Sequence, residues 1–395
     1  MRIAAAMSRT QEADLAAAEA ADAAGAELSS ASIDLAVVLV SADHAGELAA
    51  VAAAVEARLE PEVLLGAAAE GVLGPDEEVE AGPAVVVWCA DLGEGRAVPF
   101  RAWALRPERG GIAVAGWPDT RPGELTVVLA DPFSFPMADV ARRLGDDRPG
   151  QPITGGLVTP GQGRSSLLLD GRVHEDGAVG VVLQDVATRT VVSQGCRPVG
   201  EPLTVTAVDR NRILELAGAP ATERLRELVE AADPADRDLM ERGGLQIGLV
   251  AEEVRDDYAP GDFLIRGVLG VDPDAGAITV GDLVATGQTV QFQVRDADSA
   301  RADLDRRLQG IGAAQGGLLF TCNGRGQGLF GEPDHDLRQV SRALGGPVAG
   351  AFCAGELGPV GTTSHLHGFT ASLVMLGPTG TDAAPDVPGS ESRGT

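Results

Sequence analysis

Residues 66–75 read GAAAEGVLGP and residues 350–359 read GAFCAGELGP, the same order of Gly-Ala, five residues and Leu-Gly-Pro. Each copy is preceded by an apolar run, a helix-like segment and a second apolar run, and another apolar run follows its proline. Short apolar runs between turn residues are typical of buried strands. A β-α-β-β pattern that occurs twice predicts two pseudo-equivalent domains, with a chance match between Gly/Ala-rich segments as the alternative.

The segments around both copies alternate between strand and helix patterns. Leu35–Val40 is apolar throughout, as in a strand buried on both faces, and Asp43 can cap the helix that follows. Around the two copies we predict the strands Leu35–Val40, Val63–Leu65, Ala84–Trp88, Gly317–Thr321 and Phe369–Leu376, and the helices Asp43–Leu59 and Asp334–Leu344. Elsewhere we predict helices over Thr10–Leu28 and Pro136–Leu144 and from Thr222 and Ser299, and strands at Leu125–Ala130, Leu245–Val250, Phe263–Val271 and Val290–Val294.

Between residues 153 and 208 the pattern changes to short β-prone runs separated by Gly and Pro, which is typical of an antiparallel meander. Together these patterns predict an α/β fold of the mixed α+β kind, with two pseudo-duplicated domains whose mixed β-sheets are flanked by helices. Residues 377–395 are rich in Gly, Pro, Ser and Asp and have little to bury, which predicts a disordered tail.

The chain has 395 residues and a net charge of −27, from 31 Lys+Arg against 58 Asp+Glu. This balance argues against nucleic acid and anionic membranes as partners, because both attract basic surfaces. Every basic residue is an arginine, so a Schiff-base lysine and a Walker lysine are excluded. No apolar run approaches the ~18 residues of a membrane span. No secretory leader is evident, so we expect a cytoplasmic protein.

The four cysteines, Cys89, Cys196, Cys322 and Cys353, form no CxxC pair, which argues against a disulfide framework and a zinc ribbon. His365 and His367, two residues apart on a predicted strand, place both imidazoles on one face. These rings, with Cys322 and Cys353, are open to three interpretations: a zinc site, a cysteine–histidine nucleophile, or buried side chains without chemistry. No ligand spacing is diagnostic, so we assign no metal, no cofactor and no catalytic residue.

The densest group of unusual residues is TCNGRGQGLFG at 321–331. Its glycines allow backbone N–H groups to approach a ligand, and Arg325 offers a planar fork for a carboxylate or phosphate. The glycines from Gly326 formally match a dinucleotide fingerprint, but Glu332-Pro333 separates them from the next helix, which argues against that function. With Glu356 after the following strand, the loop can instead hold a zwitterion, with Arg325 on its carboxylate and Glu356 on its amine.

Two further clusters have weaker signals. Residues 194–200 read QGCRPVG, and Arg197 on this loop is either a second anion contact or a solvated side chain. Glu70, Glu77, Glu78 and Glu80 form an acidic run, which we expect to be a solvated surface.

The chain resembles the FIST family (F-box and intracellular signal transduction) in several ordered motifs. The N-terminal half is similar through residues 65–72 (LGAAAEGV) and 194–200. The C-terminal half is similar through Cys322-x-Gly324-Arg325-Gly326, Leu329-Phe330-Gly331, the 350–359 stretch and His367-Gly368-Phe369-Thr370. The resemblance implies an N-terminal FIST-like domain at residues 1–210, a C-terminal one at residues 211–376, and the tail beyond.

The resemblance also implies a sensory signal-transduction module that binds a small, amino-acid-like carboxylate and acts on a signalling partner. Family members often carry an output domain, which this chain has no room for, so it resembles a stand-alone FIST protein. The residues expected to bind the ligand are Cys322, Asn323, Gly324, Arg325, Gly326, Gly355, Glu356, His367 and Arg197. The alternatives are an enzyme that uses the Cys322, Cys353, His365 and His367 cluster, or a protein-interaction scaffold.

Overall fold

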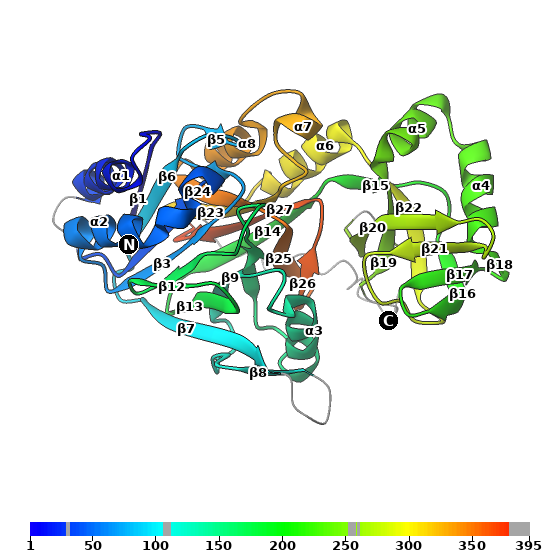
Figure 1. The fold of residues 1–395 in the computed structure, drawn as a ribbon, viewed down its shortest axis with the longest axis horizontal. Coiled ribbons are helices and arrows are strands. Elements are labelled where there is room, and N and C mark those ends of the chain that lie inside the picture. Colours follow the sequence, from blue (N-terminus) through cyan, green and yellow to red (C-terminus); the bar gives the residue numbers. More distant parts are fainter. Residues whose placement is uncertain (29–31, 106–111, 252–257, 259–260, 379–395) are drawn as a thin grey trace, which may run out of the picture.

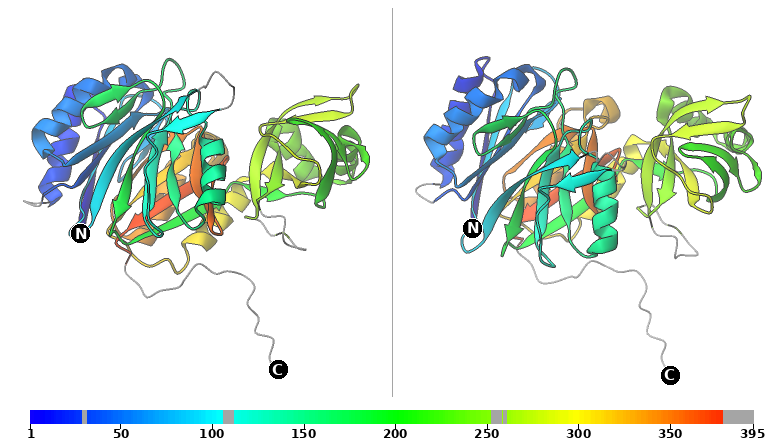
Figure 2. Two further views of the ribbon diagram at one scale, coloured as in Figure 1. Left: turned by 90° about the horizontal axis from the view of Figure 1, so that it is seen from below. Right: turned by 60° about the horizontal axis from the view of Figure 1, so that its bottom comes forward.

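Most of the described chain forms three mixed β-sheets that share one strand order. The structure is a computed structural model, and it describes residues 1–28, 32–105, 112–251, 258 and 261–378. In each sheet, two central strands run parallel and their outer neighbours run antiparallel to them. The three sheets lie side by side in one body, and a smaller barrel lies beside that body (Figure 1, Figure 2).

The first sheet is built from the N-terminal repeat. Its strand order is β1 (Arg2–Ser8), β6 (Val85–Asp91), β2 (Leu35–Val40) and β3 (Val63–Ala68). The helices α1 (Ala13–Leu28) and α2 (Leu48–Leu59) cover its outer face, and a 3₁₀ turn, η1 (Ala42–Glu47), precedes α2. Every residue of β2 and β3 is buried, because the helices cover one face and the other two sheets cover the opposite face.

The second and third repeats have the same order. The second has β7 (Arg96–Leu105), β13 (Ala178–Gln184), β9 (Leu125–Ala130) and β10 (Ile153–Leu157), with β8 (Ala113–Ala115) beyond β7 and α3 (Met137–Asp147) outside. The third has β14 (Thr188–Gln194), β27 (Thr370–Leu376), β23 (Gly316–Cys322) and β24 (Val348–Cys353), with α6 (Ala297–Leu308), the short α7 (Gln327–Phe330) and α8 (His335–Leu344). The mixed sheets flanked by helices are therefore confirmed, and the repeat predicted in two copies occurs a third time.

Each repeat contributes a β-hairpin that pairs with a strand in the sheet of another repeat. The hairpin β4 (Val72–Leu73)–β5 (Glu78–Val79) of the first joins β24 of the third, and β11 (Leu167–Leu169)–β12 (Arg172–His174) of the second joins β3 of the first. The hairpin β25 (Gly355–Val360)–β26 (Thr363–His367) of the third joins β10 of the second. This cyclic exchange locks the three repeats together around one shared apolar core, to which all three sheets contribute.

One glycine recurs at the same register position in all three repeats. Gly66, Gly155 and Gly350 lie opposite Val38, Val128 and Leu319 on the adjacent parallel strand. A Cβ atom on these glycines would lie 2.4, 1.9 and 1.8 Å from the carbonyl oxygens of those partners. The Gly of the Gly-Ala motif is thus required by close backbone approach.

The barrel is inserted between β14 and α6 and has its own apolar core. Its strands are β15 (Cys196–Pro198), β16 (Leu203–Asp209), β17 (Arg212–Leu216), β18 (Ala219–Pro220), β19 (Leu245–Val250), β20 (Phe263–Asp272), β21 (Ala277–Val280) and β22 (Thr289–Arg295). The helices α4 (Ala221–Ala231) and α5 (Pro234–Leu239) and a π-helical turn, η2 (Met240–Gly244), connect β18 to β19. Pairing of β19 with both β20 and β22 closes the ring.

The predicted antiparallel meander over residues 153–208 is wrong. The strand β10 runs parallel to β9, and the strands after it belong to different sheets: β11 pairs with β3, β13 with β9, β14 with β27, and β15 and β16 with β22. Strand propensity marks which residues are extended, but long-range packing selects their partners.

The predicted domain boundary at residue 210 lies between β16 and β17, inside the barrel. The division into domains 1–210 and 211–376 stays a prediction. Of the predicted tail, residues 379–395 lie outside the described residues. Among the helices that the structure describes, none has the length and apolar character needed to cross a bilayer.

Candidate functional site

The loop after β23 carries most of the predicted site residues. Cys322 ends β23, and the Arg325 N–H donates to the Cys322 carbonyl oxygen (2.7 Å) to close the turn. The Asn323 N–H donates to the carbonyl oxygen of Cys353 (2.8 Å), which ties the loop to the end of β24. Gly326 has a φ of 66°, which favours glycine, and α7 follows it. The loop therefore lies at the carboxyl end of the parallel strands, where open α/β sheets bind ligands.

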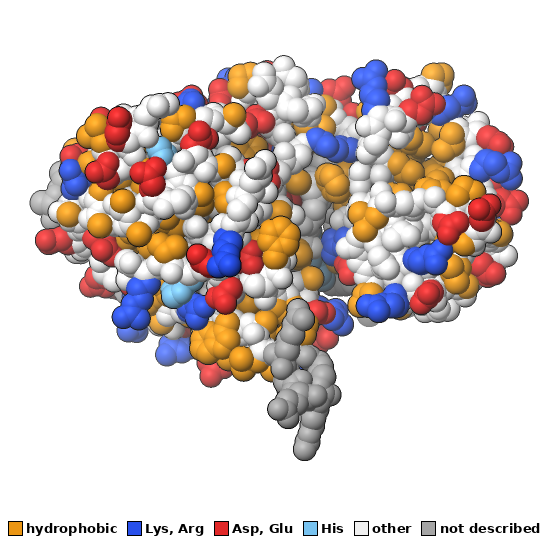
Figure 3. Space-filling view, viewed as in Figure 1, with side chains coloured by type: hydrophobic (Ala, Val, Ile, Leu, Met, Phe, Trp, Pro, Cys, Tyr) orange, Lys and Arg blue, Asp and Glu red, His pale blue; other side chains and the backbone are white. Residues whose placement is uncertain are grey.

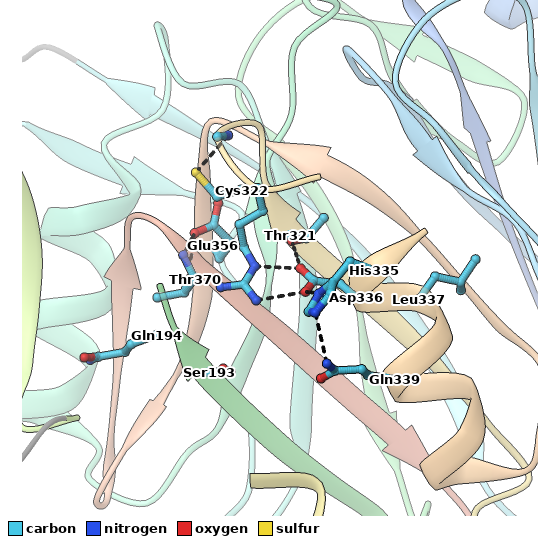
Figure 4. A network of polar contacts seen from close by, with 12 residues as sticks. Ser193, Gln194, Thr321, Cys322, His335, Asp336, Leu337, Gln339, Glu356 and Thr370 are labelled. Carbon is cyan, nitrogen blue, oxygen red and sulfur yellow. Dashed lines mark hydrogen bonds and ion pairs between the residues drawn. The ribbon is translucent and has the colours of Figure 1, made fainter. Parts of the chain in front are cut away.

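Arg325 forms a buried, bidentate ion pair with Asp336 of α8. Figure 4 shows Asp336 at the start of this helix, beside Thr321 and His335. Its Nε lies 2.6 Å from Oδ2 and its Nη2 lies 2.8 Å from Oδ1, and each side chain is 1% exposed. Thr321 donates a further hydrogen bond to Asp336 (2.8 Å), and His335 Nδ1 lies 3.1 Å from Oδ1. Burial opposes ionisation of Asp336, but the Arg325 guanidinium outweighs it and holds the pKa of Asp336 well below its usual range.

Glu356 lies at the start of β25 and is fully buried. Its Oε2 accepts two hydrogen bonds from Thr370, one from the N–H (3.1 Å) and one from Oγ1 (2.7 Å). Burial raises the pKa of Glu356 to about 8, although the Thr370 bonds and the nearby Arg325 charge pull in the other direction. With a pKa of about 8, Glu356 is mostly protonated at pH 7.

Two buried polar atoms at this place have no partner within the described residues: Arg325 Nη1 and Glu356 Oε1. The charge of Arg325 lowers the pKa of Glu356, and Cys322 interacts with both groups, so the three side chains are neighbours. Yet no ion pair joins Arg325 to Glu356 in the part of the chain that the structure describes, although ion pairs up to 3.9 Å occur elsewhere.

A hairpin from the first repeat holds this loop in place. Glu80 Oε1 accepts a hydrogen bond from the N–H of Gln327 (2.7 Å), and Glu78 Oε1 accepts one from the N–H of Leu337 (2.9 Å) at the start of α8. The expectation of a solvated acidic run is wrong for Glu78, which is only 8% exposed. Burial raises its pKa to about 7. The exchanged hairpin, which the sequence does not reveal, puts this carboxylate at the helix N-terminus.

The predicted histidines and cysteines lie near this loop, and burial shifts their pKa values. His367 is the register partner of Glu356 on β26, and its Nε2 lies 2.9 Å from the Gly358 carbonyl oxygen. Burial lowers the pKa of His367 to about 3 and raises the pKa of Cys322 to about 12. Among the residues that the structure covers, no three His, Cys, Asp or Glu side chains are grouped so that they can hold a metal ion.

Arg197 lies across the seam between body and barrel. Its guanidinium binds Asp236 through Nη2 and Asp296 through Nε (3.2 Å), so two carboxylates already use its charge. The preceding Gly195 approaches the site more closely, because a Cβ there would lie 3.2 Å from Arg325 Nη1. Phe369, on the loop before β27, has a φ of 62°, which is a strained value for a bulky residue.

The tertiary structure thus brings most of the predicted residues together. Gly355 and Glu356 begin the hairpin whose end carries His367, and Cys322 to Gly326 form the loop beside it. Arg325 and Glu356 are 1% and 0% exposed, so both side chains are covered by their neighbours. Two surface hollows of about 910 Å³ lie elsewhere, one between α4 and the β20–β21 turn and one between β8 and α3.

Sequence reasoning missed Asp336 and Arg295, an arginine that ends β22. The signal for Asp336 is an aspartate in the first turn of the helix after the Gly/Arg loop. Arg295 carries no local signal, since it lies 30 residues before Arg325 and reaches the loop only because the barrel packs against the body.

Comparison with known proteins matches both halves of the chain. A model of the FIST N domain matches residues 34–219, and a model of the FIST C domain matches residues 221–359. The uncharacterized protein Rv0628c of Mycobacterium tuberculosis (strain H37Rv) is 44% identical over 386 residues, which cover 95% of this chain and 100% of the relative. The uncharacterized protein Mb0898c of Mycobacterium bovis is 41% identical over 385 residues, covering 95% and 99%. FIST domains are in general sensory signal-transduction domains, and the chain belongs to the FIST family, with both of its domains present.

Proposed function

We propose that this FIST protein senses a small carboxylate-bearing ligand, such as an amino acid, which binds beside the loop of residues 322–326. The observation that carries the proposal is the pair of buried, unpartnered atoms, Arg325 Nη1 and Glu356 Oε1. A buried polar group without a partner costs about 1–3 kcal/mol. A ligand that pairs with both atoms recovers this cost, which supplies affinity and orientation at once.

The protonation of Glu356 determines which ligand atom fits. Oε2 already accepts two hydrogen bonds from Thr370, so the proton of neutral Glu356 belongs on Oε1. At pH 7 both Oε1 and the Arg325 Nη1 group then donate, and two neighbouring donors suit a carboxylate or carbonyl oxygen. A ligand ammonium group would instead require Glu356 to lose its proton, which burial disfavours.

The alternative of a cysteine nucleophile has less support. Burial raises the pKa of Cys322 to about 12 and that of Cys353 well above its usual value, whereas a reactive cysteine needs a lowered pKa. Burial also lowers the pKa of His365 to about 4, so this ring is neutral and offers no charge to a thiolate. A cytoplasmic signalling protein that responds to the ligand-bound state completes the proposal.

The test combines native mass spectrometry with thermal melting of the full chain. The freshly purified protein is first weighed for a bound metabolite, and its melting temperature is then measured with each standard amino acid and with acetate, succinate and pyruvate. We expect at least one carboxylate to raise the melting temperature of the wild type. Absence of both a bound mass and any ligand-dependent shift would overturn the proposal.

Two substitutions of Glu356 sharpen the test. Glu356→Gln keeps a donor beside Arg325 and retains ligand stabilisation, because the amide mimics the neutral acid. Glu356→Met removes the donor and abolishes the stabilisation. The exposed Glu332→Gln serves as the matched control, since Glu332 pairs with Arg301 and Arg338 at the surface.

A further inference from the structure

An arginine of the barrel reaches into the seam and contacts the candidate ligand loop. Arg295 ends β22, and its Nη2 donates a hydrogen bond to the Gly324 carbonyl oxygen. Its Cζ lies 6.0 Å from the centre of the Phe369 ring, which belongs to the loop between β26 and β27. The side chain is only partly buried, so it stays accessible from solvent. In the space-filling view the surface is indented between body and barrel, with arginine side chains beside the indentation (Figure 3).

The charge of Arg295 is not neutralised by a carboxylate in the described part of the chain. Its neighbours differ: Arg325 pairs with Asp336, Arg266 pairs with Asp282, and Arg197 pairs with two aspartates. Arg295 therefore keeps positive charge and free N–H groups for an anion.

The same face of the barrel carries further unused polar groups. Residues two apart on a strand share a face, so Gln293 lies on the Arg295 side of β22. Its register partner Gln246 on β19 shares that side. The two glutamines are 1% and 6% exposed, and within the described residues Gln293 Nε2 and Gln246 Oε1 have no hydrogen-bond partner. The barrel thus presents a cation and two buried amides toward the seam.

The apolar contact that joins barrel and body is small. It consists of Cys196, Val250, Phe263 and Ile265, with Tyr258 and Phe369 packed at its edge. Small, partly polar contacts between domains permit relative movement. A ligand that pairs with groups on both sides would therefore favour one barrel position, which provides a physical readout of occupancy.

We infer that the barrel completes the ligand site. Arg295 binds the carboxylate of the ligand, and the amides of Gln293 and Gln246 form hydrogen bonds with its other polar groups. The inference rests on the proposed function, since it assigns the residues that recognise the same ligand. Body and barrel then bind opposite ends of one small molecule: the Arg325–Glu356 pair from the body, and Arg295 from the barrel. The ligand class that fits is a carboxylate with a second acceptor oxygen at its other end for the Arg325–Glu356 donors, as in a dicarboxylate or an acidic amino acid.

The test compares Arg295→Gln and Arg295→Lys with the wild type in isothermal titration. The probe is whichever of glycine, L-alanine, L-glutamate and succinate raises the wild-type melting temperature most, paired with the analogue in which a carboxamide replaces its carboxylate. We expect Arg295→Gln to weaken binding of the carboxylate probe at least tenfold. Binding of the carboxamide should stay as weak as in the wild type, so the variant loses the discrimination between the two probes. Arg295→Lys should recover part of it, because the charge returns without the fork. Arg212→Gln, which removes an exposed arginine of the barrel, should bind like the wild type.

The outcomes separate the two proposals. If none of the four probes binds to the wild type, both are overturned for these ligands. If a probe binds and Arg295→Gln keeps both its affinity and its preference for the carboxylate, the role of the barrel is wrong while the proposed function stands. Melting of each variant without ligand shows whether it folds, and Gln293→Ala provides a second variant in which the core of the barrel is unchanged, with a weaker affinity expected.

Discussion

Arg325 uses Nε and Nη2 to bind both oxygens of Asp336, and this leaves Nη1 without a hydrogen-bond partner among the residues that the structure describes. The ion pair thus both anchors the loop and orients the remaining donor. The Arg325 side chain also stacks near Phe330, with Cζ 5.2 Å from the ring centre. A residue that the sequence suggests as a simple ligand contact therefore also has a structural role.

Removing either partner of this ion pair should destabilise the protein. Arg325→Ala leaves the Asp336 carboxylate buried and unpaired, which typically costs about 3–5 kcal/mol. Urea denaturation should show a correspondingly lower midpoint for Arg325→Ala than for the wild type. The midpoint of Arg325→Lys should lie between these two, because lysine keeps the charge but cannot form the two parallel hydrogen bonds. The exposed Arg338→Ala is the control, and an equal midpoint for Arg325→Ala and this control would contradict the burial of the pair.

Stability should decrease with rising pH because of Glu356. Its pKa is about 8 in the folded protein against 4.5 ordinarily, so the folded state keeps a proton that the unfolded state loses. The contribution is fully present below pH 4.5 and is lost as the pH rises through 8. Glu356→Gln cannot titrate, so its unfolding free energy should decrease less between pH 5 and pH 9. Parallel pH profiles for variant and wild type would rule out the raised pKa.

The carboxylate of Glu78 should stabilise α8 from the neighbouring repeat. Glu78→Ala removes the acceptor for the Leu337 N–H, so we expect faster amide hydrogen exchange in the first turn of α8 and a loss of about 1–2 kcal/mol. Glu77→Ala is the matched control, because the adjacent Glu77 forms an exposed ion pair with Arg9. Equal exchange in the two variants would show that the hairpin does not hold the helix.

The recurring glycine of the second repeat, Gly155, should be as intolerant of substitution as Gly66 and Gly350. In Gly155→Ala the new methyl would lie 1.9 Å from the Val128 carbonyl oxygen at a φ of 130°, so the strands must separate. We expect destabilisation of about 3 kcal/mol or more, or no soluble protein. Gly46→Ala, where nothing lies within 4 Å of the new atom, should be nearly neutral. A wild-type midpoint for Gly155→Ala would refute the close approach of β9 and β10.

Much of the fold could be predicted because apolar periodicity is local. The runs at Leu35–Val40 and Leu125–Ala130 are strands, and the helix predicted from Asp43 is present as η1 and α2. The second repeat was not recognised because its Gly155-Gly156 lacks the following Leu-Gly-Pro. The partners of the strands after residue 153 could not be predicted either, since pairing depends on contacts between segments far apart in the chain.

For the candidate site, too, some features could be predicted from the sequence and others could not. The sequence by itself determined which residues are chemically unusual, because a glycine-rich loop with one arginine and a lone glutamate after a strand stand out in composition. Only the tertiary structure decided the surroundings of each residue. Asp336 binds two of the three guanidinium nitrogens of Arg325, burial raises the pKa of Glu356, and packing of the barrel brings Arg295 to Gly324. The physical reason is that charge state and hydrogen-bond partners depend on burial and on neighbours far away in sequence, which no local pattern encodes.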